Sequence, residues 1–152
     1  MDAIYQRSRD NARTPVQWSG EAHAGFTTGT PWVEVNPNYR HINAEAVVHD
    51  PTSIFYYYKK LIQLRKQYEI IVYGEYKLLA EKDEQVFAYT RQWKDQTLLV
   101  ITSFTEDQAT FILPDHMSFS SLSLLISNYQ VTETEKKQIL LRPYEARVYL
   151  LG

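Results

Sequence analysis

The stretch from Ser8 to Trp18, SRDNARTPVQW, combines two arginines, an aspartate and an asparagine with a proline and an indole. Arg9 and Arg13 each offer a rigid fork of N–H donors, which suits a carboxylate or two vicinal hydroxyls. Because the two arginines are four residues apart, they would share a face if this stretch were helical. The stretch therefore predicts recognition of a polar ligand. The alternative is a structural ion network of Arg9, Asp10 and Arg13 beneath a loop.

Aromatic residues make up 14% of the sequence. Flat amphipathic rings serve either a packed core or a surface on which sugars stack. For the rings nearest the arginine-rich stretch, Trp18, Phe26 and Trp32, packing is the favoured interpretation and sugar stacking is the alternative.

The sequence contains no recognisable catalytic or metal-binding motif. The five glycines are isolated, so no phosphate-binding loop is present. Glycoside hydrolysis needs two carboxylates about 5–5.5 Å apart in retaining enzymes, and no complete pair is visible. The four histidines are His23, His41, His49 and His116. No serine elbow motif accompanies them, and none of their spacings beside a carboxylate is typical of a metal site. We expect no catalytic residue, no metal and no cofactor in this chain.

Composition narrows the partners and the location. The 152 residues carry a formal net charge of −2, with lysines and arginines scattered along the sequence, so nucleic acid is not expected as a partner. Cysteine is absent, which excludes disulfides and fits a reducing compartment. No apolar run could span a bilayer, and residues 1–20 lack the apolar core of a secretion signal. We therefore expect a soluble, cytoplasmic protein with no membrane partner.

The first 67 residues of the chain predict loops followed by one helix. Residues 8–50 show little periodicity and many glycines and prolines, which is typical of functional loops built onto a larger scaffold. Asp50 is a suitable N-cap and Pro51 suits the first helical position, so a helix is predicted from Asp50 to Gln67. We expect this helix to dock on a core, because one face is apolar: Ile54, Tyr57, Tyr58, Leu61, Leu64 and Tyr68.

The remaining residues predict an antiparallel β-sandwich or barrel, because short apolar runs alternate with polar connectors. Leu98–Ile101 is apolar on both faces and should lie in a central strand. The charged run at 133–137 is interpreted as a solvated loop. The predicted strands are Tyr76–Leu79, Val86–Gln92, Thr97–Phe104, Ala109–Leu113, Leu122–Ser127, Ile139–Arg142 and Glu145–Leu151.

Several motifs in order along the chain carry a family resemblance. They are SRDNARTPVQW at 8–18, HAGFTTGTPW at 23–32, VNPNY at 35–39, SIFYYYKKLIQLRK at 53–66 and LRPYEA at 141–146. Together they resemble the C-terminal portion of family 13 exo-α-glucosidases. Within that family the chain is similar to oligo-1,6-glucosidases, dextran glucosidases and trehalose-6-phosphate hydrolases.

The resemblance implies a fold and a division into domains. These enzymes have a (β/α)₈ barrel, with the active site at the C-terminal face of the strands, followed by an antiparallel β-sandwich. Residues 1–67 would then be loops and the last helix of a truncated barrel, and residues 68–152 the C-terminal β-sandwich. The fold class expected is therefore mainly β.

The resemblance also implies roles for the two arginines. Arg9 matches the arginine that helps hold the glucose unit at the non-reducing end, and Arg13 matches its neighbour in the same pocket. The family's nucleophile, acid/base and transition-state-stabilising carboxylates lie upstream of this motif. We therefore expect the chain alone to be inactive, and its parent to be a retaining α-glucosidase acting on a small α-glucoside.

Several alternatives remain open from the sequence. Val16 stands where many oligo-1,6-glucosidases have methionine, which leans towards a trehalose-6-phosphate hydrolase. The β domain could instead act alone as a carbohydrate-binding module or a structural domain. An exposed apolar face on the 50–67 helix would also offer a surface for dimerisation.

Overall fold

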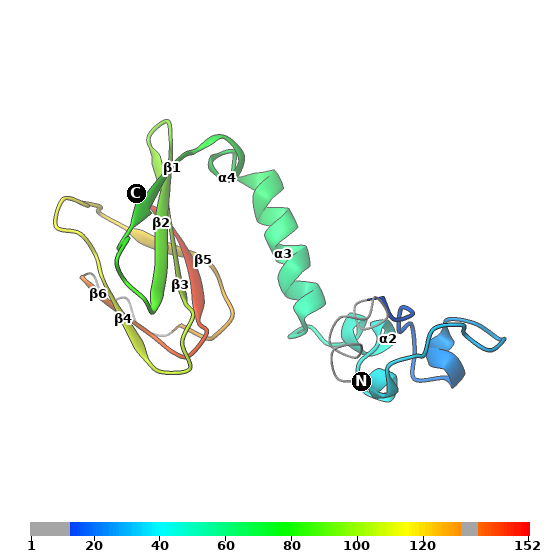
Figure 1. Ribbon diagram of the computed structural model, residues 1–152. Helices are drawn as coiled ribbons and strands as arrows, with labels where there is room; N and C mark the ends of the chain where they lie inside the picture. The colour runs from blue at the N-terminus through cyan, green and yellow to red at the C-terminus, as the bar shows by residue number, and fades with distance from the viewer. Residues whose placement is uncertain (1–12, 132–136) are drawn as a thin grey trace. The chain divides into compact units, whose positions relative to one another are not determined.

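The computed structural model describes residues 13–131 and 137–152 (Figure 1). The chain divides into two compact units, Met1–Tyr58 and Lys59–Gly152. Most of the charged run at 133–137, interpreted above as a solvated loop, lies outside the described residues.

The first unit consists of loops interrupted by single helical turns. Residues 13–50 contain short 3₁₀ helices at Ala22–Gly25 and Pro37–Arg40 and the five-residue helix α2 at Ala44–Val48. The sequence showed too little periodicity for these turns to be predicted. The prediction of a loop-rich segment is confirmed in its main feature, since no strand occurs among residues 13–58.

The predicted long helix is present but begins later than expected. Helix α3 spans Ile54–Gln67, so the predicted start at Asp50 is wrong. The Asp50 carboxylate accepts hydrogen bonds from the backbone and hydroxyl of Thr52, at 2.8 and 2.7 Å, which forms a local turn around Pro51. The first helical hydrogen bond recorded runs from the Tyr57 N–H to the Ser53 carbonyl.

The second unit is built on a five-stranded antiparallel sheet in the order β1-β2-β3-β7-β5. A separate two-stranded antiparallel sheet pairs β4 with β6. The sequence-predicted strands are confirmed, and no strand end differs by more than one residue. The observed bounds are β1 Glu75–Leu79, β2 Val86–Trp93, β3 Gln96–Ser103, β4 Ala109–Ile112, β5 Leu122–Ser127, β6 Gln138–Leu141 and β7 Ala146–Leu151.

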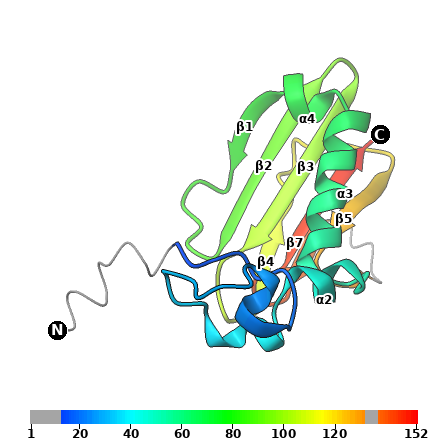
Figure 2. The same cartoon turned by 90° about the vertical axis from the view of Figure 1, so that its right-hand side faces the viewer.

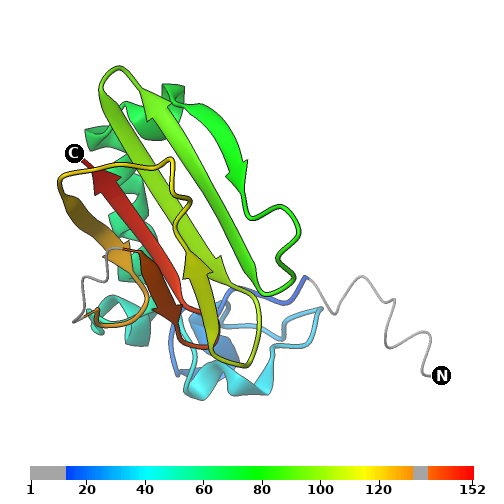
Figure 3. The same ribbon diagram turned by 90° about the vertical axis from the view of Figure 1, so that its left-hand side faces the viewer.

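The two sheets form the predicted sandwich (Figure 3). The small β4–β6 sheet contributes Phe111 and Leu141 to a core shared with Leu99 and Ile101 of β3. Strand β3 is the middle strand of the large sheet, and Leu98, Leu99, Val100 and Ile101 are all buried. The prediction that this apolar run forms a central strand is therefore confirmed.

The outer face of β3 is covered by the short helix α4, Ile70–Tyr73, which the sequence analysis missed (Figure 2). Ile70 is fully buried in a cluster with Leu98 and Val100. The Arg91 side chain on β2 donates to the backbone carbonyls of Ile70 and Gly74, at 3.2 and 2.7 Å. A Cβ at Gly74 would lie 2.5 Å from the Ile70 carbonyl oxygen, so this close approach requires glycine.

Candidate functional site

The loop that follows the predicted arginine site is held in place by Gln17 and its backbone neighbours. The Gln17 side-chain amide donates to the Asn38 side chain at 3.0 Å and to the Ile42 carbonyl. The Gln17 carbonyl accepts from the Ala44 N–H at 2.8 Å, and the Trp18 carbonyl accepts from the next N–H along the chain at 3.0 Å. Residues 17 and 18 are thus fixed to the start of α2, some twenty-five residues later in the sequence.

Asn43 holds the other side of this connection. Its side chain is buried, with its oxygen accepting from the Ala46 N–H at 2.8 Å as the N-cap of α2. Its amide nitrogen donates to the Tyr39 carbonyl at 2.9 Å. An asparagine placed before a short helical stretch is a recognisable capping signal, but the sequence analysis did not use it.

A tight turn at residues 21–25 brings the chain back onto Trp18. The N–H groups of Trp18 and Ser19 both donate to the Ala24 carbonyl, at 2.9 and 3.1 Å. His23, Ala24 and Gly25 have successive φ values of 53°, 59° and 64°, in the left-handed region. Non-glycine residues held there cost about 1 kcal/mol or more each, so the fully buried Ala24 and these hydrogen bonds must offset that cost.

The three aromatic rings nearest the arginine-rich stretch are exposed in this chain. Trp18 is 55% exposed, Phe26 47% and Trp32 84%. The preferred interpretation, that these rings pack, is therefore wrong within this chain. They are available to a ligand or to protein that covers this surface.

Of the two arginines predicted to bind a ligand, the structure describes only Arg13. Arg13 is exposed at the beginning of the described segment, four residues before Gln17, in chain that is neither helix nor strand. Arg9 lies outside the described residues, as does Asp10, so neither the ligand-binding role nor the alternative ion network is tested. Both roles remain predictions.

Among residues 13–131 and 137–152, no three or more histidine, aspartate or glutamate side chains come together in a way that could hold a metal ion. The histidines are correspondingly dispersed, with His116 on the loop between β4 and β5 and the others in the first unit. Within the described part of the chain, no helix combines the length and apolar character needed to cross a membrane.

The LRPYEA motif has a structural role in the β domain. Glu145 is fully buried, and its carboxylate lies 2.7 Å from the Arg147 guanidinium. The other carboxylate oxygen accepts from the Arg142 N–H at 2.8 Å. Burial alone would raise the pKa of Glu145, but these hydrogen bonds and the two positive charges outweigh it and hold the pKa below its ordinary value. This motif therefore fixes the turn between β6 and β7.

Comparison with known proteins extends this description. Residues 1–74 match the family model described as "Alpha amylase, catalytic domain", and residues 86–148 match "Alpha-amylase SusG C-terminal domain". An oligo-1,6-glucosidase of Parageobacillus thermoglucosidasius is 57% identical over 150 residues, which cover 98% of this chain and 27% of that protein. A trehalose-6-phosphate hydrolase of Bacillus subtilis (strain 168) is 47% identical over 154 residues, covering 99% and 27%.

The fold is shared with solved enzymes. The crystal structure of Bacillus licheniformis trehalose-6-phosphate hydrolase matches with a TM-score of 0.93 and 46% identity, over 99% of this chain and 28% of that one. The chain thus spans about a quarter of the length of the relatives it matches, 27% in both sequence comparisons. The chain belongs to the α-amylase family, glycoside hydrolase family 13, and combines sequence of the catalytic domain with a C-terminal β domain.

Proposed function

We propose that this chain is the C-terminal quarter of a retaining α-glucosidase and that residues 1–67 complete its catalytic barrel. In this proposal Arg9 and Arg13 hold the terminal glucose unit, and the catalytic carboxylates lie on the rest of the longer protein. Residues 68–152 form the C-terminal β-sandwich. The observation that carries the proposal is the alignment of nearly the whole chain with 27% of an oligo-1,6-glucosidase at 57% identity.

The proposed substrate is a small glucoside with an α-1,6 linkage. Three oligo-1,6-glucosidases are 57%, 52% and 51% identical to the chain, whereas the trehalose-6-phosphate hydrolase of Bacillus subtilis is 47% identical. These identities favour an α-1,6-linked glucoside as the substrate over trehalose-6-phosphate, the substrate suggested by Val16. The proposal includes a cytoplasmic location, which the cysteine-free sequence supports.

The fixed loop supports a positioning role for the arginine-rich stretch. The hydrogen bonds of Gln17 and Asn43 restrain the chain immediately after Arg13. A guanidinium carried on restrained backbone loses less freedom when it binds vicinal hydroxyls, and it holds the sugar in one orientation. Correct orientation of the sugar lowers the barrier of the chemical step performed by carboxylates elsewhere.

The proposal is tested by alanine substitution in the longer enzyme. Arg9→Ala and Arg13→Ala should each lower kcat/KM for an aryl α-glucoside by about 10²-fold, because the glucose unit is no longer held in its reactive orientation. Arg65→Ala is the matched control, since Arg65 is exposed on α3. An unchanged kcat/KM in both variants would contradict the assignment.

Arg147 is unsuitable as a control in this experiment. The structure places Arg147 in a buried ion pair with Glu145, so its replacement would destabilise the β domain. Any loss of activity in that variant would report on folding.

The substrate is decided by comparing two reactions in the longer enzyme. We expect kcat/KM for isomaltose to exceed that for trehalose-6-phosphate by at least about tenfold, the difference produced by one good hydrogen bond to a charged or well-positioned group. A preference for trehalose-6-phosphate would keep the glucosidase assignment and overturn the linkage.

A further inference from the structure

The inner face of the large sheet changes from apolar to polar halfway along its strands. On β2 the inward side chains Val86 and Ala88 are buried core residues, whereas the next two inward positions are Thr90 and Gln92. The same change occurs on both neighbours of β2. It runs from Leu79 to Lys77 on β1, and from Ile101 and Leu99 to Thr97 on β3.

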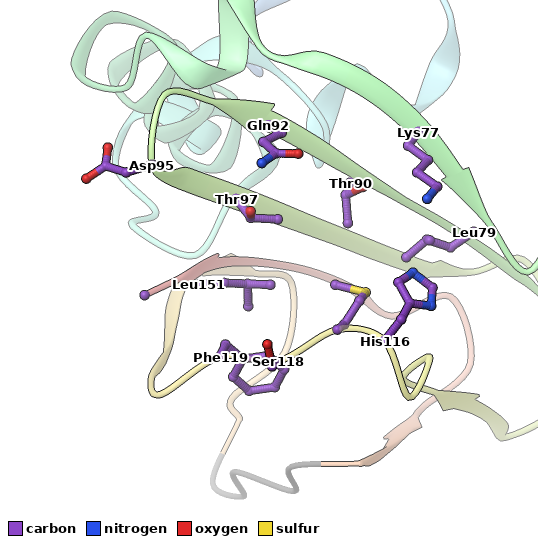
Figure 4. A pocket seen from close by; sticks show the side chains of 12 residues that line it. Lys77, Leu79, Thr90, Gln92, Asp95, Thr97, His116, Ser118, Phe119 and Leu151 are labelled. Carbon is purple, nitrogen blue, oxygen red and sulfur yellow. The ribbon is translucent and has the colours of Figure 1, made fainter.

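The length of the second sheet explains this change. Strands β4 and β6 have four residues each, whereas β2 and β3 have eight. The small sheet can therefore cover only part of the inner face. Beyond its end the connection between β4 and β5 supplies the opposite wall, and a cavity of about 290 Å³ is left between that connection and the sheet (Figure 4).

The wall of this cavity is fixed by hydrogen bonds to the end of β7. The Gly152 carbonyl accepts from the Ser120 N–H at 2.7 Å, the Ser120 hydroxyl at 3.0 Å and the Ser121 N–H at 3.1 Å. Met117 and Phe119, in the same connection, pack against the sandwich core. The cavity is therefore preformed in the folded domain, which lowers the entropy cost of binding.

The side chains around the cavity combine apolar and hydrogen-bonding surface. Leu79, Leu151 and Phe119 supply apolar surface, and Thr90, Gln92 and Thr97 supply hydroxyl and amide groups. Lining of this kind suits a sugar ring, because the C–H face of the ring packs on apolar side chains while its hydroxyls find polar partners. The cavity volume is close to the lower end of the range for small-ligand sites, about 300 Å³.

The charges around the cavity favour a neutral ligand. Figure 4 shows Asp95 at one end, with Lys77 and His116 at the other. The lysine and the aspartate cancel in formal charge, so the cavity has no excess of cations to hold a phosphate. A carboxylate can accept hydrogen bonds from two neighbouring hydroxyls, and an ammonium group can donate to others.

We propose that this cavity is a second binding site, for one or two neutral glycosyl units, on the β domain. It is distinct from the surface that carries Arg13, since all of its lining residues belong to the second unit. The residues that bind are Asp95, Thr97, Gln92 and Lys77, with Phe119 and Leu79 as apolar contacts. The site requires neither the proposed hydrolysis nor Arg9 and Arg13.

The test is an NMR titration of the isotope-labelled 152-residue chain with isomaltose, maltose and inorganic phosphate. Both sugars should move the amide signals of Thr90, Thr97 and Ser118 in a saturable way. Asp95→Asn and Thr97→Val should each weaken sugar binding by about tenfold, the loss expected when one hydrogen bond is removed. The control Asp107→Asn, at an exposed position on the β3–β4 connection, should bind like the unaltered chain.

Three results would overturn the proposal. The first is no saturable shift of these amides at sugar concentrations of about 50 mM, above the millimolar range of weak sites. The second is a sugar response confined to residues 13–58. The third is a response of the same amides to phosphate but not to either sugar. None of these results depends on hydrolysis, so they are distinguishable from failure of the proposed function.

A second measurement applies if the 152-residue chain does not fold alone. The longer protein is then run on native gels with and without dextran, in the unaltered form and as the Asp95→Asn and Asp107→Asn variants. Dextran should retard the unaltered protein and the Asp107→Asn variant more than the Asp95→Asn variant. Equal retardation of all three forms would contradict the site.

Discussion

At the residue scale, Glu145 shows how a buried charge is accommodated in the β domain. Its carboxylate accepts from Arg147 and from the Arg142 backbone, and Arg147 also donates to the Leu140 carbonyl at 2.7 Å. Both carboxylate oxygens of Glu145 and all three nitrogens of the Arg147 guanidinium therefore have a hydrogen-bond partner, as a buried ion pair requires. Removing one partner would leave the other charge buried and unpaired.

The first prediction follows from this arrangement. Glu145→Gln should lower the free energy of unfolding by about 3–5 kcal/mol, because the Arg147 guanidinium stays buried without its counter-ion. The measurement is urea denaturation followed by circular dichroism. The matched control is Asp115→Asn, which breaks the exposed 3.7 Å pair with Lys137 and should change nothing measurable. Equal effects of the two substitutions would contradict the role assigned to Glu145.

The second prediction concerns pH. Because the folded-state pKa of Glu145 lies below its ordinary value of 4.5, the unfolded chain binds more protons than the folded chain between those values. The stability that Glu145 contributes is therefore complete above about pH 5 and is lost as the pH falls through the folded-state pKa. Unfolding free energies measured between about pH 6 and pH 2.5 should converge for the unaltered chain and Glu145→Gln. A constant difference across this range would count against the ion pair.

At the element scale, the strands were predictable and the short helices were not. In β7 the apolar and aromatic residues from Val148 to Leu151 predict a strand, and the structure shows that Arg147, Tyr149 and Leu151 are its buried positions. Helix α4 has the sequence IIVY, whose β-branched residues favour a strand. It is helical because Ile70 packs on β3 and the Arg91 side chain donates to the carbonyls of Ile70 and Gly74. Those contacts join residues 17–30 positions apart, which local patterns do not reveal.

The third prediction tests the loop of the first unit. Asn43→Ala should destabilise the structure around α2 by about 1–2 kcal/mol, since it removes the N-cap and leaves the Tyr39 carbonyl without its donor. Amide hydrogen exchange at Ala46–Val48 should quicken accordingly. Asn36→Ala, which removes one exposed capping bond to Asn38, is the control and should affect this exchange less. Exchange at α2 that stays unchanged in Asn43→Ala would show that the cap is dispensable.

The fourth prediction concerns the apolar face of α3. Of the fourteen residues in this helix, all within the described chain, only Leu64 is buried. The expected docking of the helix on a core is confirmed only at its C-terminal end, where Leu64 is buried and the following residue Tyr68 packs against the Ile70 cluster of the β domain. Exposed side chains recur on one face at Ile54, Tyr58 and Ile62, with exposed fractions of 86%, 65% and 43%.

Such a face should cause the 152-residue chain to associate in solution, as the sequence-based dimer hypothesis supposes. Sedimentation velocity should show dimers or larger species at micromolar concentrations, and the double variant Ile54→Lys/Ile62→Lys should remain monomeric. Lys66→Ala, at an exposed position of the same helix, is the control. An unaltered chain that is monomeric throughout would contradict this association.

At the scale of the whole molecule, the fold could be predicted from the sequence more readily than the binding surfaces could. The sandwich follows from strand patterns within residues 75–151, each of which is local in the sequence. The proposed sugar cavity, in contrast, is lined by residues that are far apart in the sequence, such as Lys77, Phe119 and Gly152. Polar residues at inward strand positions, such as Thr90 and Thr97, were the available signal. These residues indicate a cavity only when the structure shows that the short β4–β6 sheet leaves them uncovered. The arginine assignment rested on family resemblance, because no local pattern separates a sugar-binding arginine from a structural one.

The central claim is that this chain positions a sugar and that a longer protein supplies the acids that cleave it. The most direct measurement compares the initial rate of aryl α-glucoside hydrolysis by the purified 152-residue chain with that of a chain extended to the length of its relatives. The extended chain should hydrolyse the aryl α-glucoside, and the 152-residue chain should show no hydrolysis at any concentration. Hydrolysis proportional to the concentration of the 152-residue chain would contradict the account.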